Sequence, residues 1–256
     1  MILEDLCDQV RRVVEGEPRL IQLPSEGKVV FVGDTHGDLE ASERVIDRYL
    51  REPYRIVFLG DYVDRGDDSE GNIQFLFRMK RDHPEEIFLL AGNHEGFMTK
   101  PLYPADFWES LPARKRRLYD QVFSALPLCA TSSNGVIALH GALPDLRVLE
   151  ELNRIEWGDS NWDRIVWGDF VEAGGDFLGQ PWGRPQFGGD YFCRLMERYQ
   201  KRLLIRSHQP NAPTLMFQDR CITIFTSRAY PLARTIVVAD MEKEIRGAGD
   251  VRIERI

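Results

Sequence analysis

The sequence predicts an α/β fold, and two observations support this prediction. In the first third of the chain, short β-type runs alternate with stretches in which apolar residues recur at helical spacing. Late in the chain, three further β-type runs follow one another without helices between them. The alternation indicates one sheet with crossover helices, and the late runs indicate a second sheet that packs against the first.

Apolar residues at helical spacing mark the segments expected to be helices. Residues 3–15 form the first, which is expected to end near Gly16. Residues 38–51 and 70–82 are expected to be the helices that alternate with the first strands. Residues 97–126 are expected to be helical as well.

The β-type runs are short, and most of them end at a glycine or serine followed by a polar residue. The first five are residues 28–32, 55–59, 87–91, 135–139 and 202–206. The three late runs are residues 214–217, 221–225 and 234–239. Residues 168–190 are rich in glycine and aromatic side chains and have no clear period, which predicts either a mobile loop over a site or a surface Ω-loop.

The composition is that of a globular protein, with 43% hydrophobic and 29% charged residues, and 256 residues are enough to bury a large core. The 33 Lys and Arg against 41 Asp and Glu give a net charge of −8. This charge counts against a general nucleic-acid-binding protein, because such proteins carry a basic surface. A phosphate-containing substrate remains compatible, since metal ions or a pair of arginines reverse the sign of the local charge.

Neither a targeting segment nor a membrane-spanning segment is expected. The first 18 residues lack the basic start and unbroken apolar run of a signal peptide, and no stretch approaches the roughly 20 apolar residues of a membrane helix. The four cysteines are widely spaced and form no CxxC pair, so reduced thiols are expected rather than a disulfide framework or a zinc ribbon. We therefore expect a cytoplasmic protein with no membrane partner.

The side chains that follow the first five β-type runs are carboxylates, imidazoles and one amide, all of which bind metal ions. They are Asp34 and His36 after the first run, Asp61 and Asp64 after the second, Asn93 and His94 after the third, His140 after the fourth and His208 after the fifth. Because loops beyond the carboxyl ends of strands gather at one edge of an α/β sheet, these residues are expected to converge on one small volume.

Taken singly, an aspartate after a strand is usually a cap or turn residue, and a lone histidine is usually structural. Four of the five histidines, however, stand at strand ends, and only His83, which is expected in a solvated turn, does not. A mixed set of oxygen and nitrogen donors suits Mn, Fe or Zn, and six ligands exceed what one tetrahedral ion needs. Two ions that share a carboxylate, about 3.5–4 Å apart, are therefore expected, and such a pair can activate a bridging water for attack on a phosphoryl group.

Three glycine-containing blocks carry most of these residues: GDTHG at 33–37, GDYVDRG at 60–66 and GNHE at 92–95. They resemble the signature blocks of the phosphoprotein phosphatases, a family of metal-dependent Ser/Thr phosphatases within the calcineurin-like metallophosphoesterases. Further blocks with the same resemblance are residues 126–146, similar to the family's strand pair that ends in HGG, GRPQFG at 183–188 and RSHQ at 206–209.

The resemblance implies a single catalytic domain over residues 1–256 with its core at 28–240. The implied fold is the calcineurin-like metallophosphoesterase fold, two packed β-sheets flanked by helices in a four-layer αββα sandwich. The implied function is a metal-dependent protein serine/threonine phosphatase that hydrolyses phosphomonoesters by direct attack of a metal-bridging hydroxide. Manganese is the first expectation for its two divalent ions, with iron or zinc as alternatives.

The resemblance also implies a role for each site residue. The ligands of one metal ion would be Asp34, His36 and Asp61, and those of the other would be Asp61, Asn93, His140 and His208, so that Asp61 bridges the two ions. His94 would protonate the leaving alkoxide, and Asp64 would hold the imidazole in orientation. This pair is chemically sensible because an unprotonated alkoxide is a poor leaving group.

Substrate contacts are implied in the same way. Arg65 and Arg184 would grip the phosphoryl oxygens, for which the planar guanidinium is well suited, and Asn93 would contact the substrate as well. Tyr230 stands where the family has a tyrosine near the site, although the residues around it depart from the family pattern. Arg206 is expected to be a structural ion-pair partner rather than a catalytic residue.

A second function remains open. The related diadenosine tetraphosphate hydrolases use the same kind of site on a small phosphoanhydride, but they generally have a GNHD-like third block, whereas Glu95 resembles the protein phosphatases. The expected partner is therefore a phosphorylated protein or peptide, and regulatory subunits are unknown. A non-enzymatic scaffold is disfavoured because every expected ligand is present. The compact length resembles a stand-alone prokaryotic or archaeal catalytic domain.

Overall fold

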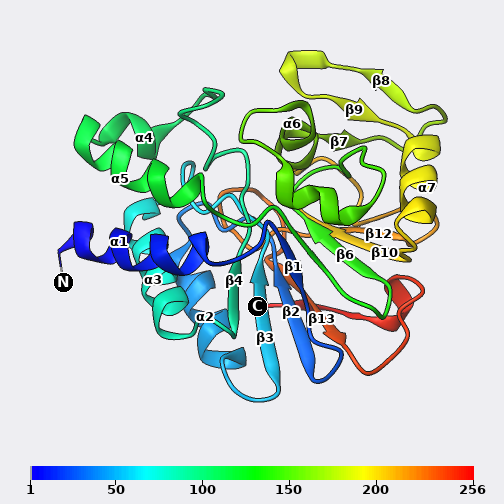
Figure 1. The fold of residues 1–256 in the computed structure, drawn as a ribbon, viewed down its shortest axis with the longest axis horizontal. Helices are drawn as coiled ribbons and strands as arrows, with labels where there is room; N and C mark the ends of the chain where they lie inside the picture. Colours follow the sequence, from blue (N-terminus) through cyan, green and yellow to red (C-terminus); the bar gives the residue numbers. More distant parts are fainter. Residues whose placement is uncertain (1) are drawn as a thin grey trace.

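The computed structural model describes residues 2–256, and its two large β-sheets pack face to face with helices on both outer faces (Figure 1). This arrangement confirms the predicted fold class. In Figure 1 one layer of helices lies to the left of the sheets, and a second group of helices lies at the upper right.

The five-stranded sheet is built around three parallel strands that the sequence predicted. Its strands in spatial order are β14 (Arg252–Arg255), β13 (Thr235–Asp240), β2 (Lys28–Val32), β3 (Tyr54–Phe58) and β4 (Ile87–Leu89). β2, β3 and β4 run parallel, with Val30 opposite Ile56. β13 runs antiparallel to both β2 and β14.

The six-stranded sheet contains the other two predicted site-bearing strands. Its spatial order is β1 (Leu20–Gln22), β5 (Cys129–Thr131), β6 (Val136–Leu139), β10 (Leu203–Arg206), β12 (Cys221–Thr223) and β11 (Leu215–Met216). β6, β10 and β12 run parallel, whereas β5 is antiparallel to β6. The carboxyl ends of β6 and β10 therefore lie at the same edge of this sheet.

Alternate residues along each central strand belong to different cores. Val29 and Phe31 of β2 lie in the core between the two sheets, whereas Val30 and Val32 lie in the core beneath the helices. The same alternation occurs in β3, β6, β10 and β13. Because both faces of these strands are buried, their sequences are continuous apolar runs, and this burial stabilises the fold by about 25 cal/mol per Å² of apolar surface.

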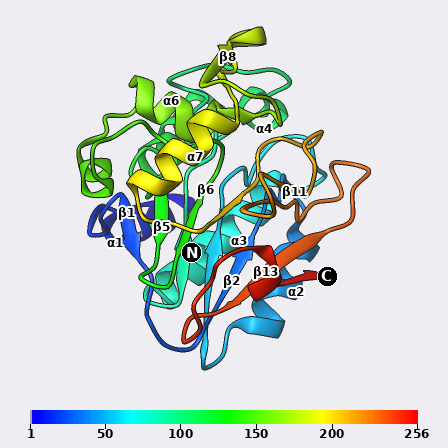
Figure 2. The same cartoon turned by 90° about the vertical axis from the view of Figure 1, so that its right-hand side faces the viewer.

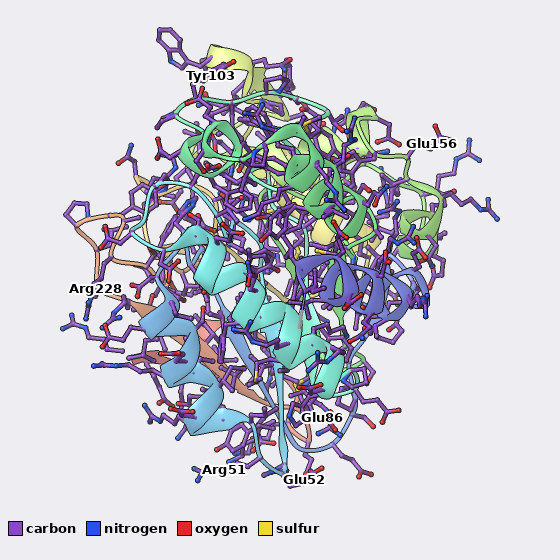
Figure 3. The ribbon with its side chains drawn as sticks, turned by 90° about the vertical axis from the view of Figure 1, so that its left-hand side faces the viewer. Arg51, Glu52, Glu86, Tyr103, Glu156 and Arg228 are labelled. Carbon is purple, nitrogen blue, oxygen red and sulfur yellow. The ribbon has the colours of Figure 1, made fainter. Side chains whose placement is uncertain are left out.

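The helices in chain order are α1 (Leu3–Glu15), α2 (Leu39–Tyr49), α3 (Ser69–Asp82), α4 (Asp106–Ser110), α5 (Ala113–Phe123), α6 (Ser160–Trp167) and α7 (Gly189–Arg198), with short 3₁₀ helices at Leu149–Arg154, Pro181–Gly183 and Ala248–Asp250. Figure 3 looks onto the layer formed by α1, α2 and α3. Asp38 and Asp68 cap the N-termini of α2 and α3, because their carboxylates accept hydrogen bonds from the N–H groups of Ala41 and Gly71. Within residues 2–256, no helix has both the length and the apolar character that crossing a bilayer requires.

The prediction of a continuous helical region over residues 97–126 is wrong in its first part. The two helices there, α4 and α5, begin only at Asp106 and are separated near Pro112. Pro101 and Pro104 precede them, and proline removes a backbone N–H donor and restricts the residue before it.

Other differences concern strands. Residues 168–190, predicted as a loop, form a small sheet of β7 (Asp169–Phe170), β9 (Gln186–Phe187) and β8 (Phe177–Gly179), which lies at the top of Figure 2. Two of the three late strands, β11 and β12, belong to the second sheet as predicted, but β13 does not. β13 joins the first parallel strands, and β11 and β12 join β6 and β10, because strand pairing depends on contacts between distant segments that periodicity does not report. β1 and β14 were not predicted.

Lys80 is a fully buried charge in the last turn of α3. Its ammonium donates hydrogen bonds to the carbonyl oxygens of Pro84 (2.8 Å) and Ile87 (2.7 Å) and to the carboxylate of Glu17. Burial lowers the pKa of Lys80, and the nearby Glu17 carboxylate opposes this shift. The lysine therefore ties the end of α3 to the turn before β4 and to the segment after α1.

We predict that Lys80→Met lowers the free energy of unfolding by about 3 kcal/mol, because it leaves a carboxylate and two carbonyl oxygens without their donor. Urea denaturation measures this loss. The matched control is Lys243→Met, since the side chain of Lys243 is 72% exposed and pairs with Asp240 at the surface. The control should change stability by less than about 0.5 kcal/mol, and equal effects of the two variants would contradict the prediction.

Candidate metal centre

The carboxyl ends of strands from both large sheets meet at one edge of the sandwich. Figure 3 labels Glu52 and Glu86 in the turns that precede β3 and β4, at the base of the molecule, so these strands run upward from there. The predicted ligands stand in the loops at the opposite ends of the strands: Asp34 and His36 after β2, Asp61 after β3, Asn93 after β4, His140 after β6 and His208 after β10. All six are buried.

Asp61 occupies the centre of this cluster. Its Oδ2 atom lies 3.7 Å from Nε2 of His36 and 3.4 Å from Nε2 of His140. Two groups of potential metal ligands share Asp61, one with His36 and His94 and the other with His140 and His208. This is the arrangement that a carboxylate between two ions requires.

Backbone carbonyl groups orient two of the imidazoles. Nδ1 of His36 donates to the carbonyl oxygen of Val63 (2.8 Å), and Nδ1 of His140 donates to that of Leu59 (2.9 Å). A carbonyl oxygen only accepts, so Nδ1 carries the proton in each ring and Nε2 faces the cluster. Fixing the ring through its second nitrogen is the usual way in which proteins orient a metal-binding histidine.

The nitrogen and oxygen atoms around His36 are arranged to bind a cation rather than to form hydrogen bonds with one another. Nε2 of His36 lies 3.7 Å from Oδ2 of Asp34 and 3.7 Å from Oδ2 of Asp61, so electron pairs face electron pairs. Oδ2 of Asp34 is buried and has no hydrogen-bond partner among residues 2–256. Unpaired buried acceptors are costly, and a divalent ion is the group that satisfies several of them together.

Asn93 and His208 complete the other half of the cluster. Nε2 of His140 lies 3.1 Å from Oδ1 of Asn93 and 3.1 Å from Nδ1 of His208. The backbone N–H of His208 points to Oδ1 of Asp34 at 3.3 Å, which links this half to the first strand loop. The structure thus brings all six predicted ligands together.

The electrostatics of the cluster favour positive charge at its centre. Burial lowers the pKa of His140, but Asp61, Asp34 and Glu95 outweigh burial and raise it to about 9. Burial and the nearby His94 lower the pKa of His36 to about 3, so this ring is neutral and its Nε2 is free to bind a metal ion. The carboxylates therefore stabilise a cation near His140, which is the charge that a bound metal ion supplies.

Uncommon backbone conformations gather at the cluster. Ten residues other than glycine have positive φ angles within residues 2–256, and five of them are predicted site residues: His36, Asp61, Asp64, Arg65 and His208. Such strained conformations persist where the surrounding structure imposes them, and they concentrate at functional sites. Gly92 allows the close packing, because a Cβ atom there would lie 2.3 Å from Oδ1 of Asp61.

Glu95 holds two of the site loops together, a role that the sequence reasoning missed. Its carboxylate accepts hydrogen bonds from the N–H groups of Asp61 (2.8 Å), Tyr62 (2.9 Å) and Gly92 (2.9 Å). Burial and the charge of Asp61 raise the pKa of Glu95 to about 7. The available signal was its place directly after His94 in the third motif.

His94 and Asp64 form the predicted pair. Nδ1 of His94 lies 2.6 Å from Oδ2 of Asp64, and the other oxygen of Asp64 accepts from the N–H of Phe107 at 2.8 Å. Nε2 of His94 accepts from Arg65, whose Nε and Nη2 both lie 3.3 Å away. In this arrangement Arg65 contacts His94 directly, a contact that the sequence did not predict.

A cleft of about 390 Å³ opens above the cluster. Arg65, Arg184 and Tyr230 line it, together with Asp61 and His94. Two hydrogen bonds fix the guanidinium of Arg184 to the carboxylate of Asp169, at 2.9 and 2.6 Å, so Asp169 is a second site residue that the sequence reasoning missed. Its place within a glycine-rich segment gave no signal.

Tyr230 lies at the site, as its place in the sequence predicted, although the residues around it depart from the family pattern. Its hydroxyl is 3.4 Å from Nε2 of His36, and its ring lies 5.7 Å from the guanidinium carbon of Arg65. Arg206 differs from expectation, because it makes no ion pair in the described part of the chain. It donates instead to Oε1 of Gln209 at 3.0 Å and lies over the ring of Phe170.

Comparisons with known proteins agree with this geometry. A family model for calcineurin-like phosphoesterases matches residues 27–212. A probable serine/threonine-protein phosphatase of Encephalitozoon cuniculi (strain GB-M1) is 30% identical over 248 residues, an alignment that covers 89% of this chain. This chain spans only 53% of that relative's length.

Two solved structures are similar in fold. One is a protein serine/threonine phosphatase from Saccharomyces cerevisiae with similarity to human phosphatase PP5, with a TM-score of 0.82 and 22% identity over 98% of this chain and 88% of that one. The other is the cold-active protein-tyrosine phosphatase of a psychrophilic Shewanella species, with a TM-score of 0.61 and 15% identity over 94% and 84% of the two chains.

We predict that Glu95→Gln weakens Mn²⁺ binding by about 10–100-fold, the usual effect of losing a residue that supports metal ligands. The amide keeps one acceptor oxygen but turns N–H groups toward a backbone donor, so the loops that carry Asp61 and Asn93 lose their alignment. Equilibrium dialysis with Mn²⁺ measures the affinity. Glu109→Gln, on the exposed surface of α4, is the matched control. Unchanged affinity in the Glu95 variant would refute the prediction.

Proposed function

Because the chain belongs to the calcineurin-like phosphoesterase family, we propose that it is a metal-dependent phosphatase that removes phosphate from serine and threonine side chains of proteins. The family's reaction is the hydrolysis of phosphoesters. The observation that carries the proposal is the position of Asp61 between two groups of potential ligands, at a cleft that also holds two arginines and a histidine–carboxylate pair.

The residues that would hold one divalent ion are Asp34, His36 and Asp61, and those that would hold the other are Asp61, Asn93, His140 and His208. Bound divalent ions supply Lewis-acid activation of water and neutralise charge on a phosphoryl group. Nitrogen and oxygen donors together suit manganese, which we propose first, and also iron and zinc.

Arg65 and Arg184 bind the phosphoryl oxygens in this proposal. Arg184 is already oriented by its two hydrogen bonds to Asp169. Arg65 is exposed and contacts Nε2 of His94, so an incoming phosphoryl group offers it oxygen acceptors that bind a guanidinium more strongly than an imidazole does. Movement of Arg65 onto the phosphoryl group would free Nε2 of His94.

His94 supplies the proton that the leaving oxygen needs. Asp64 accepts the hydrogen bond from Nδ1 and stabilises the protonated ring, which allows Nε2 to carry and release a proton. His94 also belongs to the ligand group of His36 and Asp61, so a role as a metal ligand is the competing assignment. The two roles differ in what happens to bound metal when the imidazole is removed.

We predict that His94→Asn lowers kcat on a phosphothreonine peptide by about 10²–10⁴-fold, the usual contribution of a general acid, while both metal ions stay bound. The loss should be much smaller on p-nitrophenyl phosphate, because nitrophenolate leaves without a proton. Steady-state kinetics and metal analysis of the same preparations test both statements.

His83→Asn is the matched control, because His83 ends α3 and takes no part in the cluster. It should leave kcat and metal content unchanged. Loss of a metal ion in the His94 variant would favour the ligand assignment, and an equal loss of kcat on both substrates would exclude a role as general acid.

The protein substrate is the finer part of the proposal. The Encephalitozoon relative, described as a probable serine/threonine-protein phosphatase, supports it, and so does Glu95, which stands where small-phosphoanhydride hydrolases generally have aspartate. A phosphoanhydride such as diadenosine tetraphosphate is the alternative substrate class. The cleft is open enough for a peptide, since it is bounded by exposed residues such as Trp182.

We predict that kcat/KM for a phosphothreonine peptide exceeds that for diadenosine tetraphosphate by about tenfold or more. A phosphotyrosine peptide belongs in the same panel, because its longer aromatic leaving group tests the depth of the cleft. Initial rates with the Mn²⁺-loaded protein decide the order. A preference for the dinucleoside polyphosphate would overturn the assignment of substrate while leaving the phosphohydrolase chemistry in place.

A further inference from the structure

Trp182 is an indole exposed to solvent beside the cleft. The residue is 97% exposed, yet it lines the same 390 Å³ cleft as Asp61, His94 and Arg184. No ring, cation or hydrogen-bond contact joins the indole to another residue of the described chain. The position of so large an apolar group next to the site is not explained by packing within this chain.

The backbone holds Trp182 in this position. The residue has a φ of 55°, an uncommon conformation for a bulky side chain. The peptide groups on both sides of Gly183 are fixed, because its N–H donates to the carbonyl oxygen of Gln180 and its own carbonyl oxygen accepts from Nζ of Lys100 at 2.9 Å. A Cβ atom at Gly183 would meet nothing within 4 Å, so the turn stands in open space with its backbone anchored.

Chain geometry sets how far the indole lies from the phosphoryl site. Trp182 and Arg184 are two residues apart, so their Cα atoms are separated by at most about 7 Å. One residue of an extended peptide spans about 3.4 Å, and a side chain next to a phosphorylated residue is therefore within reach of Trp182 when the phosphoryl group is at Arg184. Pro210 lines the cleft as a further apolar group, whereas the deeper lining is charged.

We propose that Trp182 is a specificity-determining residue that contacts an apolar or aromatic side chain adjacent to the phosphoserine or phosphothreonine of the substrate. This role rests on the proposed function, since it requires a peptide in the cleft. The substrate side chain covers the indole, while Arg184 and Arg65 hold the phosphoryl group. Trp182 therefore affects how tightly the peptide part of the substrate binds, and it takes no part in the proton transfer from His94.

The test uses two phosphothreonine peptides that differ only at the residues flanking the phosphothreonine, which are phenylalanine in one and glycine in the other. The protein should favour the phenylalanine peptide by about tenfold in kcat/KM, mainly through a lower KM. Trp182→Ala should reduce the preference to less than about twofold through a higher KM, and Trp182→Phe should keep most of it. Metal content and thermal midpoint of each variant show whether it is folded.

Phe177→Ala is the matched control, because Phe177 is 59% exposed on β8, the strand before the turn that carries Trp182, but lines a different hollow. It should keep the preference for the phenylalanine peptide. Equal preference in the protein and in Trp182→Ala would overturn the role of Trp182 alone. Cleavage of neither peptide by the protein would overturn both this role and the proposed protein substrate.

A third outcome concerns a second copy of the chain. If the indole instead contacts another molecule of this protein, sedimentation should depend on concentration for the protein and not for Trp182→Ala, with no difference between the peptides. That result would overturn the proposal. The proposal is supported if the preference for the phenylalanine peptide is lost in Trp182→Ala and kept in Trp182→Phe.

Discussion

The buried carboxylate of Asp61 is the constraint on which the rest of the site depends. It lies, largely buried, beside a second carboxylate, Asp34, and three imidazoles, so the group needs positive charge to offset the loss of hydration. Burial and the charge of Asp61 raise the pKa of Asp34 to about 6, which reflects the repulsion between the two carboxylates. A cluster with this repulsion persists only if the scaffold holds its members in place.

The scaffold does so by joining the two sheets at this edge. The N–H of Asp34 donates to Oγ of Ser207 at 2.9 Å, and the N–H of Gly33 donates to Oγ1 of Thr226 at 2.9 Å. Ser207 belongs to the loop after β10, so a ligand from the five-stranded sheet is tied directly to the loop that carries His208. The distance between the two halves of the metal centre is therefore set by hydrogen bonds between the sheets.

The sequence predicted the parts of this site that are encoded locally. Asp34, His36 and His140 each follow a strand and lie at its end, so they were found from the set of metal-binding side chains that repeats at the strand ends, together with the family motifs. Glu95 and Asp169 were missed because their roles depend on a partner from another segment. The late strand β13 was assigned to the wrong sheet for the same reason, since pairing is decided by tertiary packing.

The site has two regions: a buried centre, which contains the potential metal ligands, and an exposed rim, which contains Trp182. The centre is buried, and a change to any of its ligands leaves other buried polar atoms unpaired. The turn that carries Trp182 has open space around it, so its side chains can change without disturbing the core. Arg184 connects the two regions, because it is fixed by Asp169 yet lies two residues from the exposed indole. The two sheets thus keep the ligands in a fixed arrangement, while the exposed residues at the rim of the cleft, which contact the substrate in our proposal, can change.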